Sequence, residues 1–145
     1  MEKNLGIATL LLRISLAAGF LSAVASRLGF WGVHSSGWQH YLAYVAQVNS
    51  FAPAAIIPFL AIASTVFETG LGILLIIGYK TRWAALGTCG LSLLFILTMA
   101  YSFGVKEPLD YSVFAFSAGA FLLACIPKYR WSLDEITERS LRRAF

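Results

Sequence analysis

The chain has 145 residues, of which 59% are hydrophobic and only 12% are charged. Soluble domains are typically about 45–50% apolar and about 25% charged, so this composition indicates a membrane protein and excludes an ordinary soluble domain. The formal net charge is +4, but too few charges lie outside the apolar segments to form a binding face for nucleic-acid phosphates.

Four apolar segments approach the length of about 20 residues that a helix needs to cross a bilayer. In chain order they are residues 5–28, 54–78, 83–104 and 111–127. We expect an all-α, polytopic membrane protein in which four transmembrane helices form a bundle packed through small residues. The whole chain, residues 1–145, is predicted to be a single membrane domain.

The connection between the first two segments carries apolar and aromatic side chains at helical spacing. These residues are Trp38, Tyr41, Tyr44, Val45 and Val48. The pattern predicts an interfacial helix in the first outer loop, which lies on the membrane surface or caps the bundle.

Residues 131–145 form a second amphipathic segment outside the predicted spans. Ser132 and Glu135 have the spacing of a capping box, and Ile136, Leu141 and three arginines follow them. We expect a cytoplasmic amphipathic helix that contacts anionic lipid, with docking to a partner protein as the alternative.

The distribution of lysine and arginine predicts the orientation of the chain. Most of these residues lie at the N-terminus, in the connection between the second and third spans, or in the tail, whereas residues 28–51 contain none. We therefore expect a multi-pass protein of the cell membrane with both termini in the cytoplasm. The basic residues that we expect to contact lipid or a partner are Lys80, Arg82, Arg139, Arg142 and Arg143.

Two ionisable residues interrupt the predicted spans and are candidate functional residues. Arg13 lies in the first span, and Glu68 is the only charged residue between positions 54 and 78. Counted from the cytoplasmic ends of their spans, both lie at a depth of about 12–15 Å, so we expect Arg13 and Glu68 to approach each other. Ser64 and Thr65 are placed on the same helix face as Glu68.

Two interpretations of this predicted pair are open. In the first, an ion pair fixes the register of the two helices, and the hydroxyl groups of Ser64 and Thr65 complete its hydrogen bonds. In the second, the residues bind a ligand or handle a proton, because charged groups inside a bilayer are costly and typically mark a functional site.

Arg27 lies near the outer end of the first span and shares a helix face with Arg13. Its side chain can extend to the membrane surface, or it can close the outer mouth of a cavity together with Asp110. His34 and His40 have no cysteine nearby, and we predict no metal site.

Two stretches of the chain resemble the DoxX family of small four-span membrane proteins. They are LLLRISLAAGF, which contains Arg13, and ETGLGILLIIGYKTRWAA, which begins at Glu68. The family's arginine, glutamate, glycines and Thr-Arg turn are matched by Arg13, Glu68, Gly72, Gly78, Thr81 and Arg82, and Arg27 stands where a basic residue commonly ends the first helix. The resemblance implies a link to the small subunits of thiosulfate:quinone oxidoreductases and to membrane oxidoreductase assemblies.

The resemblance and the buried charges together favour an integral membrane subunit of an oxidoreductase assembly. In this hypothesis a quinone binds in the bundle, Arg13 donates a hydrogen bond to a quinone oxygen, and Glu68 transfers a proton. The chain contains no CxxC pair, so we expect no intrinsic cofactor. We expect the electron donor to lie on a cytoplasmic or membrane partner. Whether the chain is active alone is left open. The alternatives are a transporter or binding protein for a small solute or lipid, which favours a homo-oligomer, and a structural membrane anchor.

Overall fold

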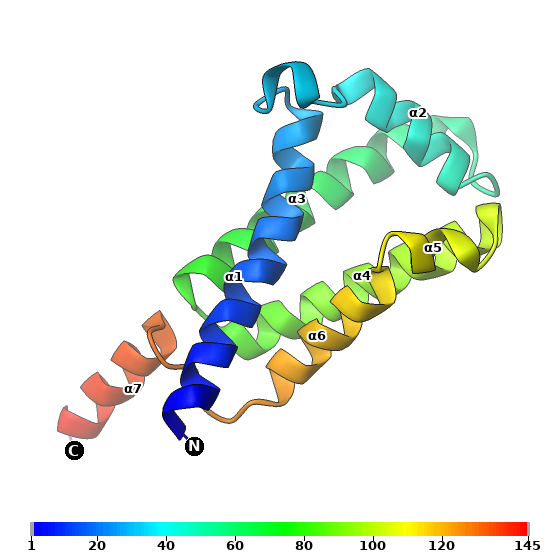
Figure 1. Ribbon diagram of the computed structural model, residues 1–145. Coiled ribbons are helices and arrows are strands. Elements are labelled where there is room, and N and C mark those ends of the chain that lie inside the picture. Colours follow the sequence, from blue (N-terminus) through cyan, green and yellow to red (C-terminus); the bar gives the residue numbers. More distant parts are fainter. Residues whose placement is uncertain (1, 145) are drawn as a thin grey trace.

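The computed structural model describes residues 2–144 of the chain and the side chains of residues 3–141 (Figure 1). Within this range the chain is helical and contains no strand, which confirms the predicted all-α class. In chain order the elements are α1 (Glu2–Arg27), η1 (Gly32–His34), α2 (Trp38–Val48), η2 (Ala54–Ile56), α3 (Ile57–Ile77), α4 (Thr81–Phe103), α5 (Lys106–Asp110), α6 (Val113–Cys125) and α7 (Leu133–Ala144).

Three of the described helical segments are long and apolar enough to cross a membrane, namely Lys3–Arg27, Ala54–Ile77 and Thr81–Phe103. They correspond to the first three predicted spans. The fourth predicted span contains α6, which has only 13 residues and a length of about 20 Å, compared with the about 30 Å of a hydrocarbon core. The helix is short because Ser112, with a φ of 55°, precedes it and the extended Ile126 follows it. A fourth full span is therefore not confirmed.

The long helices pack as two pairs. Helix α1 lies antiparallel against α3, α4 packs along α6, and contacts between α3 and α4 join the pairs (Figure 1). Helices α1 and α3 approach closely at Gly72, where a Cβ atom would lie 2.8 Å from Leu21 Cγ and 3.5 Å from the carbonyl oxygen of Ala17. The missing side chain lets the two backbones meet, and it fixes Ala17 opposite Gly72 in the register of the pair.

Exposed aromatic side chains mark both ends of α4. Trp83 and Tyr101 are each 71% exposed. They are 18 residues apart, which places them on the same helix face and about 27 Å from each other. Leu94 and Leu97 are exposed on this face between them. An apolar stripe of this length with an aromatic residue at each end is typical of a helix that spans the bilayer.

The helix predicted in the first connection is present as α2, and it folds onto the long helices. Tyr41 and Val45 are buried against Ile57 and Ala61 of α3, and the carbonyl oxygen of Val48 accepts a hydrogen bond from α4. Helix α2 thus bridges from the end of α1 toward the end of α4 (Figure 1). We call this end of the molecule, with α2 and α5, the loop end, and the opposite end, with both termini and α7, the tail end.

The predicted capping box at the start of α7 is formed in part. The backbone N–H of Glu135 donates to Ser132 Oγ at 3.2 Å, as a capping box requires. The carboxylate of Glu135, however, accepts its hydrogen bond from the backbone N–H of Trp131 at 2.9 Å rather than from Ser132. Both bonds order the turn that leads into α7.

Helix α7 is attached to the turn between α3 and α4 through Asp134. The Asp134 carboxylate accepts hydrogen bonds from the backbone N–H groups of Lys80 at 2.7 Å and Thr81 at 2.8 Å. It therefore caps the N-terminus of α4 from a position more than 50 residues away along the chain. The Asp134 N–H in turn donates to the carbonyl oxygen of Gly78 at 3.0 Å.

Candidate functional site

Glu68 lies inside the interface between α1 and α3 and is 1% exposed. Its partner is Arg27, in the last turn of α1, whose side chain is 11% exposed. Arg27 Nη2 donates a hydrogen bond to Glu68 Oε1 at 3.1 Å, and Nη1 lies 2.7 Å from Oε2. Oε2 receives no directed hydrogen bond, so the shorter contact is ionic. Both carboxylate oxygens face the guanidinium group, which orients the pair.

The guanidinium group of Arg27 is also held by α2 and α3. Its Cζ lies 3.8 Å from the centroid of the Tyr41 ring, a cation–π contact, and its Nη1 donates to Thr65 Oγ1 at 3.3 Å. The hydroxyl groups of Tyr41 and Ser64 share a hydrogen bond of 2.6 Å. We call Arg27, Glu68, Tyr41, Ser64 and Thr65 the Arg27–Glu68 cluster.

This cluster combines a proton acceptor with groups that can stabilise its charge. Glu68 can accept or release a proton, and Arg27 stabilises the carboxylate in surroundings that water screens poorly. Burial raises the pKa of Tyr41, which lies outside the spanning helices, while the charge of Arg27 opposes the increase. The phenol therefore stays protonated at neutral pH, and its O–H is available to the hydrogen bond with Ser64.

The structure does not bring Arg13 to Glu68, so the predicted pairing is corrected to Arg27 and Glu68. Arg13 is 2% exposed and lies at the tail end. Its Nη2 donates to the carbonyl oxygen of Ile76 at 3.3 Å and to that of Trp131 at 2.9 Å. Arg13 thus binds the last turn of α3 and ties the segment before α7 to it.

The reason for this correction is the register of α1 against α3. Ala17 lies opposite Gly72, so Arg13, one turn earlier, reaches the end of α3 rather than its middle. The first turns of α1 extend past α3 and pack beside the segment before α7, where a Cβ atom at Gly6 would lie 2.7 Å from Arg130 Cδ. Counting depth from the end of each apolar segment assumes that the helices begin at the same level, and these two do not.

Arg27 and Asp110, the predicted outer-mouth residues, are not in contact. Asp110 forms an ion pair with Lys106, one turn earlier, and both side chains are exposed. Arg27 turns into the bundle toward Glu68 instead of toward α5. Burial of the carboxylate explains this choice, because an unpaired Glu68 would cost far more than an unpaired exposed Asp110.

The predicted contact residues for lipid or a partner are at the tail end where the structure describes them. Lys80 directly precedes α4, Arg82 lies in its first turn, and Arg139 in α7 pairs with Glu135 at 2.6 Å. The side chains of two further candidates, Arg142 and Arg143, lie outside the described residues. In the part of the chain that the structure describes, no group of three or more His, Cys, Asp or Glu side chains is gathered as a metal site would require.

Two functional contacts were missed by reasoning from the sequence. Tyr41 was assigned only to the apolar face of α2, although a buried tyrosine hydroxyl normally requires a partner. Asp134 belongs to residues 131–145, for which the sequence predicts only an amphipathic helix, and nothing in the local pattern points to a cap on α4. Both contacts join segments that are distant in the sequence.

The positions that carry the family resemblance have defined structural roles. Gly78 ends α3 with a φ of 67°, and a Cβ atom there would lie 2.5 Å from Ser132 Cβ and 2.8 Å from Arg13 Nη1. Glycine is therefore required both by the left-handed backbone and by the close packing. Thr81, which begins α4, donates its N–H to Asp134.

A comparison with protein families supports the resemblance. The DoxX family model matches residues 8–101, a range that includes all five residues of the Arg27–Glu68 cluster. No curated protein and no solved structure matched the chain.

Proposed function

Because the chain belongs to the DoxX family of membrane proteins, we propose that it is a membrane subunit of an oxidoreductase assembly. Its Arg27–Glu68 cluster handles a proton in the reaction of a quinone. The observation that carries this proposal is the 1% exposure of Glu68 in a helix that is apolar enough to span a membrane. Ionisable groups in such helices typically belong to ligand sites or proton relays.

We assign the tail end to the cytoplasm, because the cytoplasmic loops of membrane proteins are enriched in lysine and arginine. Lys80, Arg82 and Arg139 lie at this end, whereas the loop end carries Lys106, which is paired with Asp110. The Arg27–Glu68 cluster lies toward the loop end and therefore exchanges protons with the outer side of the membrane.

The donors and acceptors of the cluster fit a quinone oxygen. Glu68 Oε2 is buried and is held by the ionic contact with Arg27 Nη1 at 2.7 Å, but it receives no directed hydrogen bond, so it keeps a lone pair that can accept a proton. Arg27 Nη1 and Nη2 supply N–H donors on the same side of the carboxylate. The ring of Tyr41 covers the guanidinium group at 3.8 Å and shields it from water.

A quinone supplies two-electron chemistry in which each carbonyl oxygen gains a proton as the ring is reduced. The electrons come from a redox centre on the partner subunit, since this chain has no CxxC pair. Glu68, which is paired with Arg27 as a carboxylate, would take up a proton from water at the loop end and pass it on as one of the two protons required; the other would come from water. Arg27 would stabilise the carboxylate of Glu68 before the proton is taken up and after it is released.

Mass spectrometry of organic extracts from the detergent-purified protein tests the proposal. We expect a quinone in extracts of the parent protein and of Glu138→Ala, a control in the exposed part of α7, and none in Glu68→Ala. Circular dichroism confirms that each variant is folded. A different small molecule lost only from Glu68→Ala would favour the solute- or lipid-binding alternative, and equal quinone in all three samples would refute the assigned site.

A second candidate function, a purely structural subunit, is favoured by how completely Arg27 is engaged. Glu68, Thr65 and Tyr41 contact its guanidinium group from three sides. In that case the pair locks α1 to α3, and Glu68→Gln lowers thermal stability without any change in bound small molecules. A redox-linked role instead requires that Glu68→Gln retain the fold and lose the ligand or its reaction.

A further inference from the structure

We propose that the groove between α7 and the tail end of α3 binds the head group of an anionic phospholipid. We call it the α7 groove. This site is separate from the Arg27–Glu68 cluster and rests only on the placement of the chain in a membrane, not on a redox role. The lipid also contacts the apolar side chains that continue from the groove onto α3.

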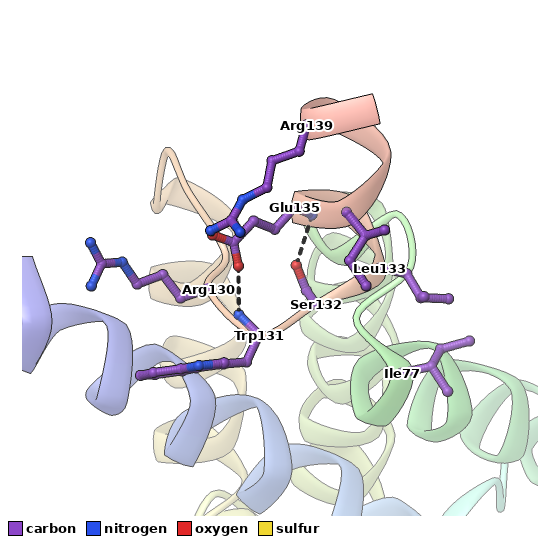
Figure 2. Close-up of a pocket in the computed structure, with 8 residues that line it drawn as sticks. Ile77, Arg130, Trp131, Ser132, Leu133, Glu135 and Arg139 are labelled. Carbon is purple, nitrogen blue, oxygen red and sulfur yellow. Dashed lines mark hydrogen bonds and ion pairs between the residues drawn. The ribbon is translucent and has the colours of Figure 1, made fainter. Parts of the chain in front are cut away.

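The α7 groove has a volume of about 630 Å³ and combines apolar and basic side chains (Figure 2). Ile77, Leu133 and Ile136 supply apolar lining, and Trp131 supplies an aromatic ring. Arg130 and Arg139 supply the basic groups. An occupant that fits this lining must be apolar along one part and negatively charged along another.

The apolar lining of the groove is continuous with a membrane-facing surface. Ile73, Ile76 and Ile77 near the end of α3 are all 43–48% exposed. On α7, Leu133 and Ile136 are spaced to share one helix face, and Ile136 is 63% exposed. Neither surface is covered by another part of the described chain, so an acyl chain can lie along α3 and reach α7.

The basic part of the groove suits a phosphate group. Arg139 is held by Glu135 in an exposed i,i+4 pair, and pairs of this kind are weak. Its planar guanidinium group can therefore turn to a phosphate and bind two oxygens at once. Glu135 itself stays bound to the backbone N–H of Trp131, as Figure 2 shows, so its carboxylate has a partner when Arg139 moves.

The same features favour a lipid over a soluble protein. Trp131 is 54% exposed and lies at the tail end with Trp83, where aromatic side chains typically meet the head groups. Amphipathic helices with basic residues at this level bind anionic lipid through both their apolar face and their charge. Because Asp134 of α7 caps α4, a bound lipid would also hold the turn between α3 and α4 in place.

Native mass spectrometry of the delipidated, detergent-purified full chain tests this proposal. The protein is titrated with phosphatidylglycerol and with phosphatidylcholine that carry the same acyl chains. We expect phosphatidylglycerol to bind at a concentration about tenfold lower, because the choline cation of phosphatidylcholine offsets the charge of its phosphate next to Arg139. Arg139→Gln should remove this preference, and Ile136→Asn should weaken the binding of both lipids.

Lys3→Gln is the matched control, because Lys3 is exposed at the same end and does not line the α7 groove. It removes the same charge and should leave the preference for phosphatidylglycerol unchanged. An equal loss in Lys3→Gln would show only general attraction to charge and would overturn the assignment of the groove. Unchanged lipid binding in Arg139→Gln or in Ile136→Asn would overturn it as well.

Discussion

Replacing Arg27 by Met should destabilise the protein strongly because it leaves the carboxylate of Glu68 buried without its counter-ion. Loss of one partner from a buried ion pair typically costs about 3–5 kcal/mol, and the Glu68 side chain is only 2% exposed. The substitution also removes the cation–π contact with Tyr41, which is worth about 0.5–2 kcal/mol. We expect Arg27→Met to lower the free energy of unfolding by an amount near the upper end of the range given for the ion pair.

Glu68→Leu should cost less than Arg27→Met. Arg27 lies in the last turn of α1, so its long side chain can extend to the membrane surface, and it keeps the ring of Tyr41 as a partner. The double variant removes both charges and should be close to Glu68→Leu alone. The pair then has a coupling energy of at least about 3 kcal/mol, since the buried charge that Arg27→Met leaves unpaired is absent from the double variant.

The coupling can be measured by equilibrium unfolding of the four proteins in mixed micelles, with increasing sodium dodecyl sulfate and tryptophan fluorescence as the signal. A second cycle with Arg13→Met in place of Arg27→Met is the control. Arg13 does not contact Glu68, so its effect should add to that of Glu68→Leu within about 0.3–0.5 kcal/mol. Additive effects of Arg27 and Glu68, or strong coupling of Arg13 to Glu68, would refute the assigned pairing.

Three further predictions concern the tail end. Asp134→Ala should cost about 1 kcal/mol and speed hydrogen exchange in the first turn of α4, because it removes the N-cap; unchanged exchange there would contradict the cap. Gly78→Ala should lower the free energy of unfolding by more than about 1 kcal/mol, because Gly78 has a φ of 67° and is closely packed. Gly90→Ala, at a position with open space around it, should be close to neutral in the same unfolding assay. Similar losses of stability in both variants would contradict the packing at Gly78. The backbone N–H of Trp131 holds the pKa of Glu135 below its ordinary value of 4.5, so its stabilisation of α7 is present above pH 4.5 and is lost as the pH falls through the lowered pKa. The protection of the α7 amides, corrected for the intrinsic exchange rate at each pH, should fall in that acidic window and stay constant there in Glu135→Gln; identical protection profiles would exclude this role.

Much of the fold could be predicted because the physical signal is local. The long apolar segments and the helical spacing of Tyr41 and Val45 require no knowledge of distant contacts, and these helices are present. The short fourth helix could not be predicted in the same way. Its start depends on Ser112 in a left-handed backbone conformation, which the apolar pattern that follows does not reveal.

The candidate site could be predicted in its chemistry but not in its pairing. Glu68 is recognisable as an isolated charge in an apolar segment, and its need for a cationic partner follows from the cost of burial. Whether Arg13 or Arg27 pairs with Glu68 depends on the axial offset between α1 and α3. The contact of Gly72 with Ala17 and Leu21 sets that register, and a small residue can mark such a contact anywhere along a helix.

Redox-induced infrared difference spectroscopy is the most direct test of proton handling by Glu68. The purified protein is reconstituted with a quinone that is reduced electrochemically, so no partner subunit is needed. We predict a band of a protonated carboxyl group, above the amide region, that changes on reduction in the parent protein and in Arg139→Gln and is missing in Glu68→Gln. The same spectral change in the parent protein and in Glu68→Gln would contradict the proposal that Glu68 exchanges the proton.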